Sequence, residues 1–97
     1  MNETTPVACT LTPAGLAAQA GRWQRLIARA GTGRTETAAG LRLSFRPDAE
    51  DDLRALVAVE TECCQWATWT VERTAETVVL DVSSSAEGAA ALRGMFC

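Results

Sequence analysis

Two adjacent cysteines, Cys63 and Cys64, follow Glu60 by one helical turn near the end of an apolar helical pattern. At about 100° per residue, Glu60 falls inside the apolar arc of that helix, with one cysteine on either side of it. A carboxylate buried without a partner is costly, whereas a thiolate is both the nucleophile and the metal ligand that cysteine provides. The pattern therefore indicates thiol chemistry. Glu60 would serve as an oxygen ligand, as the base that takes the thiol proton, or as a proton donor to a leaving group.

A purely structural interpretation of the same residues stays open. Cys63 and Cys64 would then be small core hydrophobes. Glu60 would lie at the helix edge, paired with Arg42, with Arg46 or with an arginine of a partner chain. The burial of Glu60 and the identity of its partners distinguish the two interpretations.

The other two cysteines are the candidates to complete a site. While helical, Cys63 and Cys64 lie about 100° apart and cannot form a mutual disulfide. A disulfide between them would need local unwinding of the helix, and otherwise one or both would meet Cys9 or Cys97. Two or three thiolates suit Cu(I), Zn(II), Hg(II) or trivalent arsenic, and the paired C-x-x-C spacing of a four-cysteine zinc site is absent. The candidate metal ligands are therefore Cys9, Cys63, Cys64, Cys97 and Glu60. In an enzyme, Glu60, Cys63 and Cys64 would be catalytic.

Composition excludes several classes of function. The 97-residue chain has a net charge of −3, all nine of its basic residues are arginine, and it lacks histidine and tyrosine. A Ser-His-Asp triad is therefore excluded, and an acidic chain is a poor nucleic-acid binder. No apolar run approaches the roughly 20 residues of a membrane span, and the N-terminus has no signal-peptide pattern. We expect a cytoplasmic protein with reduced thiols that binds neither nucleic acid nor membrane.

Hydrophobic periodicity predicts the order β-α-β-β-α-β-β-α. The expected elements are a strand over 7–11, a helix over 12–30, a hairpin over 35–46, a helix over 47–66, a hairpin over 69–82 and a helix over 86–95. The apolar face of the first helix is expected at Leu16, Ala20, Trp23, Ile27 and Ala30. Asp48 is the expected cap of the second helix, and three further acidic residues would lie at its positive end.

This order predicts a single α+β domain over residues 1–97, with a flexible segment at 1–6 and a mobile tail at 95–97. We expect a two-layer sandwich, in which an antiparallel sheet carries its helices on one face, and a ferredoxin-like arrangement is the nearest plan. The other sheet face would be solvated or would form a homodimer, for which Val79 and the tryptophans leave room.

Two further groups of side chains have open roles. Arg22, Arg25 and Arg29 form a stripe on the polar face of the first helix. This stripe is either a solvated surface or a site for an anion or an acidic partner. Trp66 and Trp69 flank the cysteine pair. They are either core residues or an aromatic lid over the thiols. Such a lid would keep water from the thiols and strengthen charge interactions at Glu60.

The segments 9–13 (CTLTP) and 60–66 (ETECCQW) resemble a group of small uncharacterised bacterial proteins, mainly actinobacterial, with a C-x-L start and an E-x-x-C-C-x-[FW] core. Some are associated with regulators of the mercury-responsive type. The resemblance implies a soft-metal or metalloid role for Cys9, Glu60, Cys63 and Cys64, with a transcriptional regulator as a partner. The group usually has proline after the cysteine pair. Because Gln65 stands there instead, we expect the second helix to continue past it.

Three hypotheses for function follow. The favoured one is binding of a soft ion, namely mercury, copper(I), zinc or arsenic, by a buffer, carrier or sensor module. The second is a thiol redox enzyme or a carbon–metal cleaving enzyme, similar to organomercurial lyase only in needing two thiols and a carboxylate. The third is a non-catalytic domain that dimerises or binds a small ligand.

Overall fold

The computed structural model describes residues 13–95, apart from the side chains of Pro13, Leu16, Cys63 and Met95. Its elements are α1 (Pro13–Ala30), β1 (Gly31–Thr37), β2 (Gly40–Phe45), the short 3-10 helix η1 (Pro47–Ala49), α2 (Glu50–Cys63), β3 (Thr68–Arg73), β4 (Val78–Ser83) and α3 (Ala86–Met95). The expected strand over 7–11 and the expected flexible segment over 1–6 lie outside the described residues. The expected tail begins inside α3, which includes residue 95, and its last two residues lie outside the described part.

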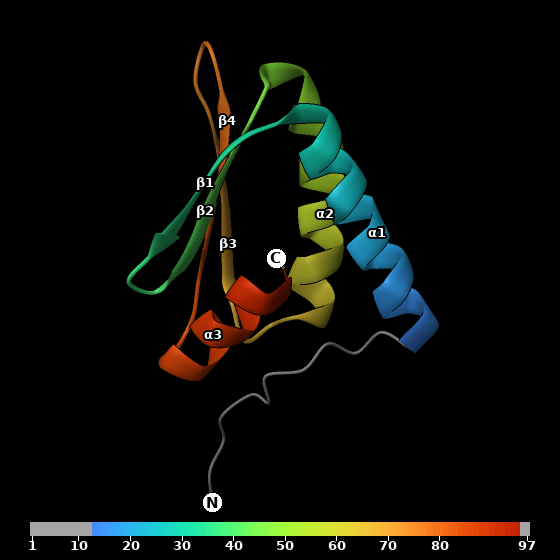
Figure 1. Cartoon of the computed structure of the whole chain (residues 1–97), viewed down its shortest axis with the longest axis vertical. Helices are drawn as coiled ribbons and strands as arrows, with labels where there is room; N and C mark the ends of the chain where they lie inside the picture. The colour runs from blue at the N-terminus through green and yellow to red at the C-terminus, as the bar shows by residue number, and fades with distance from the viewer. Residues whose placement is uncertain (1–12, 96–97) are drawn as a thin grey trace, which may run out of the picture.

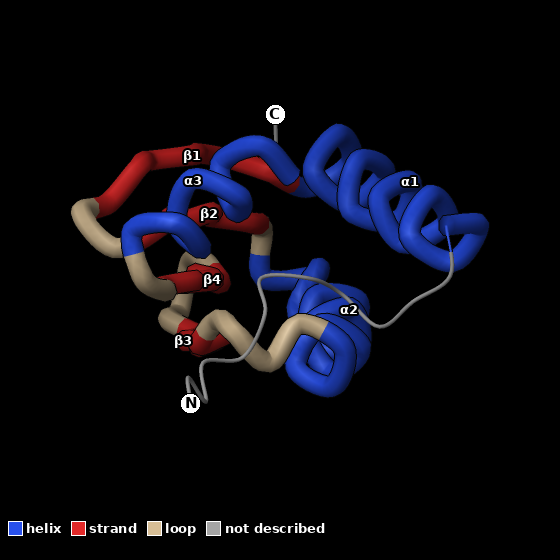
Figure 2. Tube along the Cα trace, turned by 90° about the horizontal axis from the view of Figure 1, so that it is seen from below, coloured by secondary structure: helices blue, strands red, loops and turns tan. Residues whose placement is uncertain are grey.

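The four described strands form one antiparallel sheet in the order β1-β2-β4-β3. Helices α1 and α2 lie over one face of this sheet, and α3 lies against the lower end of the same side (Figures 1 and 2). The predicted α+β class, with an antiparallel sheet and its helices on one side, is confirmed. The chain repeats a helix-then-hairpin unit twice before α3. The ferredoxin-like order is not confirmed. It would place the strand expected over 7–11 at the centre of the sheet, whereas β2 and β4 already have neighbours on both sides.

The core lies between the sheet and the helices. Alternate side chains of the two central strands point into it and are buried: Leu41, Leu43, Phe45, Val78, Leu80 and Val82. The helices add Trp23, Leu26, Leu53, Leu56, Val57 and Leu92 to the same cluster. The predicted period-two pattern of both central strands is therefore confirmed, and it places the helices on the predicted single face.

The buried stripe of α1 is rotated from the expected one. Gln19, Trp23, Leu26 and Ala30 are buried, whereas Ala20 is exposed. The helix also packs against α2, which draws the polar Gln19 inward toward a partner on that helix.

Glycine permits the direct change from α1 into β1. The helix ends at Ala30 as predicted, but the strand begins at Gly31, four residues earlier than expected. A Cβ at Gly31 would lie 2.6 Å from the carbonyl oxygen of Ile27. Only a residue without a side chain therefore fits this transition.

The predicted cap of the second helix is wrong. Asp48 lies within η1 and bonds to Arg46 (3.4 Å), while the N-cap of α2 is Ala49, which has no side chain able to cap. The 3-10 turn supplies the entry instead, because the Ala49 N–H donates to the Arg46 carbonyl (3.0 Å). The acidic first turn predicted for this helix is present.

The second helix ends at Cys63, three residues before the predicted end at Trp66. The Cys64 N–H still donates to the Glu60 carbonyl (2.7 Å), but Cys64 leaves helical geometry with φ −121° and ψ 67°. Strand pairing explains this end, since Thr68 already pairs with Ser83 in the sheet. The chain must reverse within the four residues between, so having Gln65 in place of proline does not extend the helix.

The sheet face away from the helices is mainly polar. Arg42 and Asp81 face each other across β2 and β4 and form an ion pair (3.0 Å), and Val79 is half-buried. The tryptophans do not support a dimer through this face, because Trp23 lies in the core between the helices and the sheet, and Trp66 and Trp69 pack against that core. The predicted contribution of the tryptophans to such a dimer is therefore wrong, and the homodimer itself stays a prediction. No helix in the described part of the chain is long and apolar enough to cross a bilayer.

Glu50 makes the fold acid-sensitive at one defined point. Arg54 Nε donates to Glu50 Oε2 (2.9 Å) and Arg73 Nη1 to Glu50 Oε1 (2.8 Å), which lowers the pKa of the Glu50 carboxyl. A carboxyl with a lowered folded-state pKa stabilises the fold above its unfolded-state pKa, about 4.3, and that contribution is lost as pH falls through the folded-state value. We expect Glu50→Gln to flatten the dependence of melting temperature on pH in this acidic window. An unchanged slope in Glu50→Gln, compared with Asp51→Asn as control, would contradict this.

Candidate functional site

Glu60 is buried beneath α1, with only 2% of its surface exposed. Trp23 Nε1 donates to Glu60 Oε2 (2.8 Å), and Gln19 Nε2 donates to the same oxygen (3.1 Å). The Gln19 amide also reaches the Leu56 carbonyl (3.4 Å). The inward position predicted for Glu60 is confirmed, and two side chains of α1 hold one of its oxygens.

Neither Arg42 nor Arg46, the two arginines of this chain named as alternative partners of Glu60, is bonded to it. Arg42 pairs with Asp81, and Arg46 pairs with Asp48. These arginines are held on the far sheet face and beside η1, whereas Glu60 faces α1, so the alternative that Glu60 pairs with Arg42 or Arg46 is wrong. Pairing with an arginine of a partner chain stays a prediction. Within the described part of this chain, the partners of Glu60 are neutral N–H donors.

The two oxygens of Glu60 have different surroundings. Both hydrogen bonds reach Oε2, and within residues 13–95 Oε1 accepts none. Oε1 is therefore the position at which a bound cation or a further proton donor would complete the environment of Glu60.

Cys64 lies one turn after Glu60 and is 1% exposed. Its backbone holds it at the helix end, since its N–H donates to the Glu60 carbonyl and its own carbonyl accepts from Trp69 Nε1 (3.4 Å). The ring of Trp69 stacks on Trp23, with 6.3 Å between centroids and 23° between planes. Glu60, Cys64, Trp23 and Trp69 therefore form one connected cluster between α1, α2 and β3.

Trp66 plays a different part from Trp69. It is half-buried against the core, and its carbonyl accepts from Ser84 Oγ (2.6 Å). Its indole Nε1 is buried and has no acceptor among the described residues. Of the two tryptophans that flank the cysteine pair, Trp69 therefore belongs to the Glu60 cluster, whereas Trp66 is hydrogen-bonded to Ser84.

The remaining predicted ligands are only partly placed. Cys63 is the last residue of α2, but its side chain lies outside the described part of the structure. Cys9 and Cys97 lie outside it altogether. Among the described residues, no three Cys, Asp or Glu side chains are grouped as metal ligands. The geometry assumed for the cysteine pair was wrong. Because Cys64 leaves the helix, the two cysteines are not consecutive positions of one regular helix.

Gln19 and Trp23 are the site residues that the sequence pattern did not reveal. They are four residues apart and so share a helix face, and Leu26 and Ala30 continue the same stripe. A glutamine on a stripe with tryptophan and leucine is a signal for a buried polar partner. The predicted apolar face ran through Ala20 and not through Gln19, so the sequence pattern did not indicate this partner.

No model of a known protein family matches this chain, and comparisons with curated proteins and with solved structures gave no significant match. The function is therefore inferred from the chain's own residues. The residues that carry that inference are Glu60, Cys64 and their partners on α1.

Proposed function

We propose that this protein binds a soft metal or metalloid ion through cysteine thiolates, as a buffer, carrier or sensor. Cys64 and Cys63 are the first ligands, and Cys9 and Cys97 are the candidates for a second or third thiolate. Glu60 accepts the thiol proton or provides an oxygen ligand. The observation that carries the proposal is a buried carboxylate, held by neutral donors at one oxygen only, one turn before a buried cysteine.

The electrostatics of this cluster favour a cation. In its ionised form Glu60 would carry a negative charge in a region of low dielectric, and a metal ion beside Oε1 would offset that charge. Binding of such an ion requires the thiol to lose its proton. Glu60 is one turn from Cys64 along the chain, so it is a suitable acceptor for that proton.

The position of Cys64 on α2 favours metal binding over a thiol enzyme. Reactive cysteines often lie at helix N-termini, where the positive end of the helix stabilises the thiolate. Cys64 lies at the opposite end of α2, where the dipole is negative and attracts cations. A thiolate at this position is stabilised by a bound metal rather than by the helix.

The cellular setting belongs to the same proposal. A reducing cytoplasm would keep all four thiols available. The resemblance around Cys9, Glu60, Cys63 and Cys64 implies a transcriptional regulator as the partner that receives or reports the ion. The cytoplasmic location and the regulator partner both depend on metal binding itself. Metal binding is therefore the first property to measure.

The test is native mass spectrometry of the reduced protein, titrated in turn with Cu(I), Zn(II), Hg(II) and arsenite. We expect one ion to be retained per chain or per dimer, and Cys63→Ala, Cys64→Ala to weaken its binding at least a hundredfold in a chelator competition. Glu60→Gln keeps the shape of the side chain and removes its charge. It should weaken binding about 10–100-fold, which is the usual effect of removing a residue that supports the ligands of a metal site.

The matched control for Glu60→Gln is Glu62→Gln, since Glu62 is an exposed residue of the same helix. Its affinity for the ion should equal that of the parent. Equal ion binding by the parent and by the double cysteine variant would overturn the proposal. Failure to retain any of the four ions, together with rapid alkylation of one thiol near neutral pH, would favour the thiol enzyme instead.

A further inference from the structure

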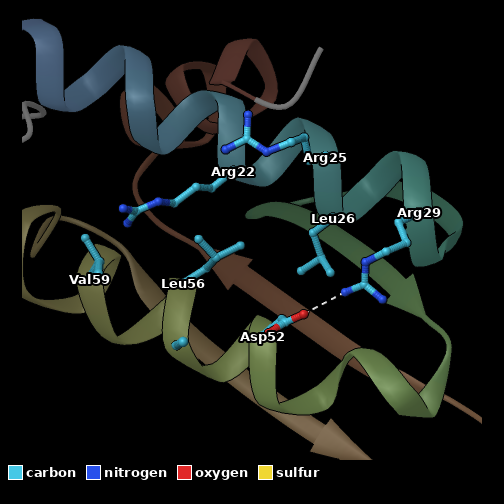
Figure 3. A pocket seen from close by; sticks show the side chains of 8 residues that line it. Arg22, Arg25, Leu26, Arg29, Asp52, Leu56 and Val59 are labelled. Atoms are coloured by element: carbon cyan, nitrogen blue, oxygen red, sulfur yellow. Dashed lines mark hydrogen bonds and ion pairs between the residues drawn. The ribbon is translucent and has the colours of Figure 1, made fainter.

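A groove of about 580 Å³ runs between α1 and α2, separate from the Glu60 cluster (Figure 3). Its apolar wall consists of Leu26 from α1 with Leu56 and Val59 from α2. The volume falls within the range of about 300–1,000 Å³ typical of small-molecule sites. The groove is therefore large enough for one small organic ligand.

Three arginines of α1 line the same groove, and their charges are not equally balanced. Arg29 bridges to Asp52 on α2 (2.7 Å) and closes one end. Arg22 and Arg25 form no ion pair with any residue that the structure describes. In Figure 3, Arg22 extends from α1 toward α2 and ends near Val59. Arg22 is therefore the guanidinium that reaches across the groove beside the apolar wall. The Arg25 guanidinium lies back along α1, with Nη1 3.2 Å from where a Cβ at Gly21 would be, and adds positive charge at the α1 rim of the groove.

We infer that this groove binds a small amphipathic carboxylate, with its apolar body against Leu26, Leu56 and Val59 and its carboxylate on Arg22, while Arg25 adds positive charge at the same rim. Arginine recognises carboxylates through paired, charge-assisted hydrogen bonds. Apolar lining with a few charged groups at one side is the general composition of such sites. The inference uses none of the residues of the proposed metal site, so either can fail without the other.

Charge favours a free molecule over a lipid surface as the occupant. The chain has a net charge of −3, and the acidic first turn of α2, with Asp51 and Asp52 exposed, lies at one end of the groove. An anionic membrane would be repelled by these carboxylates, whereas a single carboxylate can approach the two arginines alone. The concave groove between the two helices also fits the single alkyl chain of a small carboxylate better than the flat surface of a membrane.

The test is a titration of the full chain with octanoate, followed through backbone amide chemical shifts in NMR spectra. Octanol supplies the same chain without the charge, and acetate supplies the charge without the chain. We expect octanoate to shift amides of α1 and α2 along the groove in a saturable manner. Octanol and acetate should each bind at least tenfold more weakly, because each lacks one half of the interaction.

Two pairs of variants make the assignment specific. Arg22→Ala, Arg25→Ala should weaken octanoate binding at least tenfold, whereas Arg42→Ala, Arg46→Ala removes two arginines elsewhere and should leave it unchanged. Ala55→Asp adds a carboxylate to the groove lining, and Ala58→Asp adds one to an exposed position of α2 outside it. Only the first of these two should weaken binding.

Several results would overturn the inference. These are the absence of saturable octanoate shifts, equal binding of octanol and octanoate, or equal binding by the parent and the Arg22, Arg25 variant. A fourth is binding to vesicles of phosphatidylcholine and phosphatidylglycerol without binding of free octanoate, which would assign the arginines to a lipid surface.

Discussion

Replacing Trp23 with alanine is expected to lower the free energy of unfolding by about 3–5 kcal/mol, as large aromatic truncations in cores do. The indole is buried, stacks on Trp69 and donates the shorter of the two hydrogen bonds to Glu60. Its loss removes the largest apolar side chain of α1 and leaves a buried carboxylate with one donor. Urea denaturation of the reduced protein, followed by far-UV circular dichroism, measures the change.

Trp23→Phe separates the two contributions. Phenylalanine keeps most of the aromatic packing against Trp69 but cannot donate to Glu60, so about 1–3 kcal/mol should be lost. Combining Trp23→Phe with Glu60→Gln should then cost less than the sum of the two single changes, because both remove the same interaction. Strict additivity would show that the hydrogen bond contributes little to stability and that packing accounts for the whole effect of Trp23.

Gly40→Ala is expected to cost about 3 kcal/mol through overpacking. Gly40 begins β2 and pairs with Ser83 of β4. A Cβ there would overlap the carbonyl oxygen of Val82 and lie 2.9 Å from its carbonyl carbon. Both atoms belong to the backbone of a central strand, so no side-chain rotation relieves the clash and the pairing of the two strands must shift. Thermal unfolding measures the effect.

Gly33→Ala is the matched control in the neighbouring strand. At Gly33 a Cβ would meet only the Ser44 side chain, at 3.8 Å or more, which is ordinary van der Waals contact. We expect this substitution to change stability by no more than about 0.5 kcal/mol. Equal effects of the two substitutions would mean that loss of chain flexibility, rather than the close approach of Val82, decides the outcome at Gly40.

The sequence by itself determined the features that depend on local periodicity. Leu41, Leu43 and Phe45 alternate inward as predicted, both hairpins form, and α3 spans the predicted residues. The inward position of Glu60 also followed from helical spacing within α2. Each of these depends on side chains a few residues apart, whose relative directions are set by the backbone alone.

The tertiary structure decided everything that depends on distant neighbours. Glu60 bonds to Gln19 and Trp23, which precede it by 41 and 37 residues, rather than to an arginine. The end of α2 at Cys63 is set by the pairing of β3 with β4, and the groove beneath Arg22 exists only because α1 packs beside α2. Periodicity shows which side of an element is buried, but it does not show what that side packs against. The partner of a buried side depends on how the helices and the sheet pack. Here the packing of α1 against α2 places the buried Glu60 carboxyl among neutral donors.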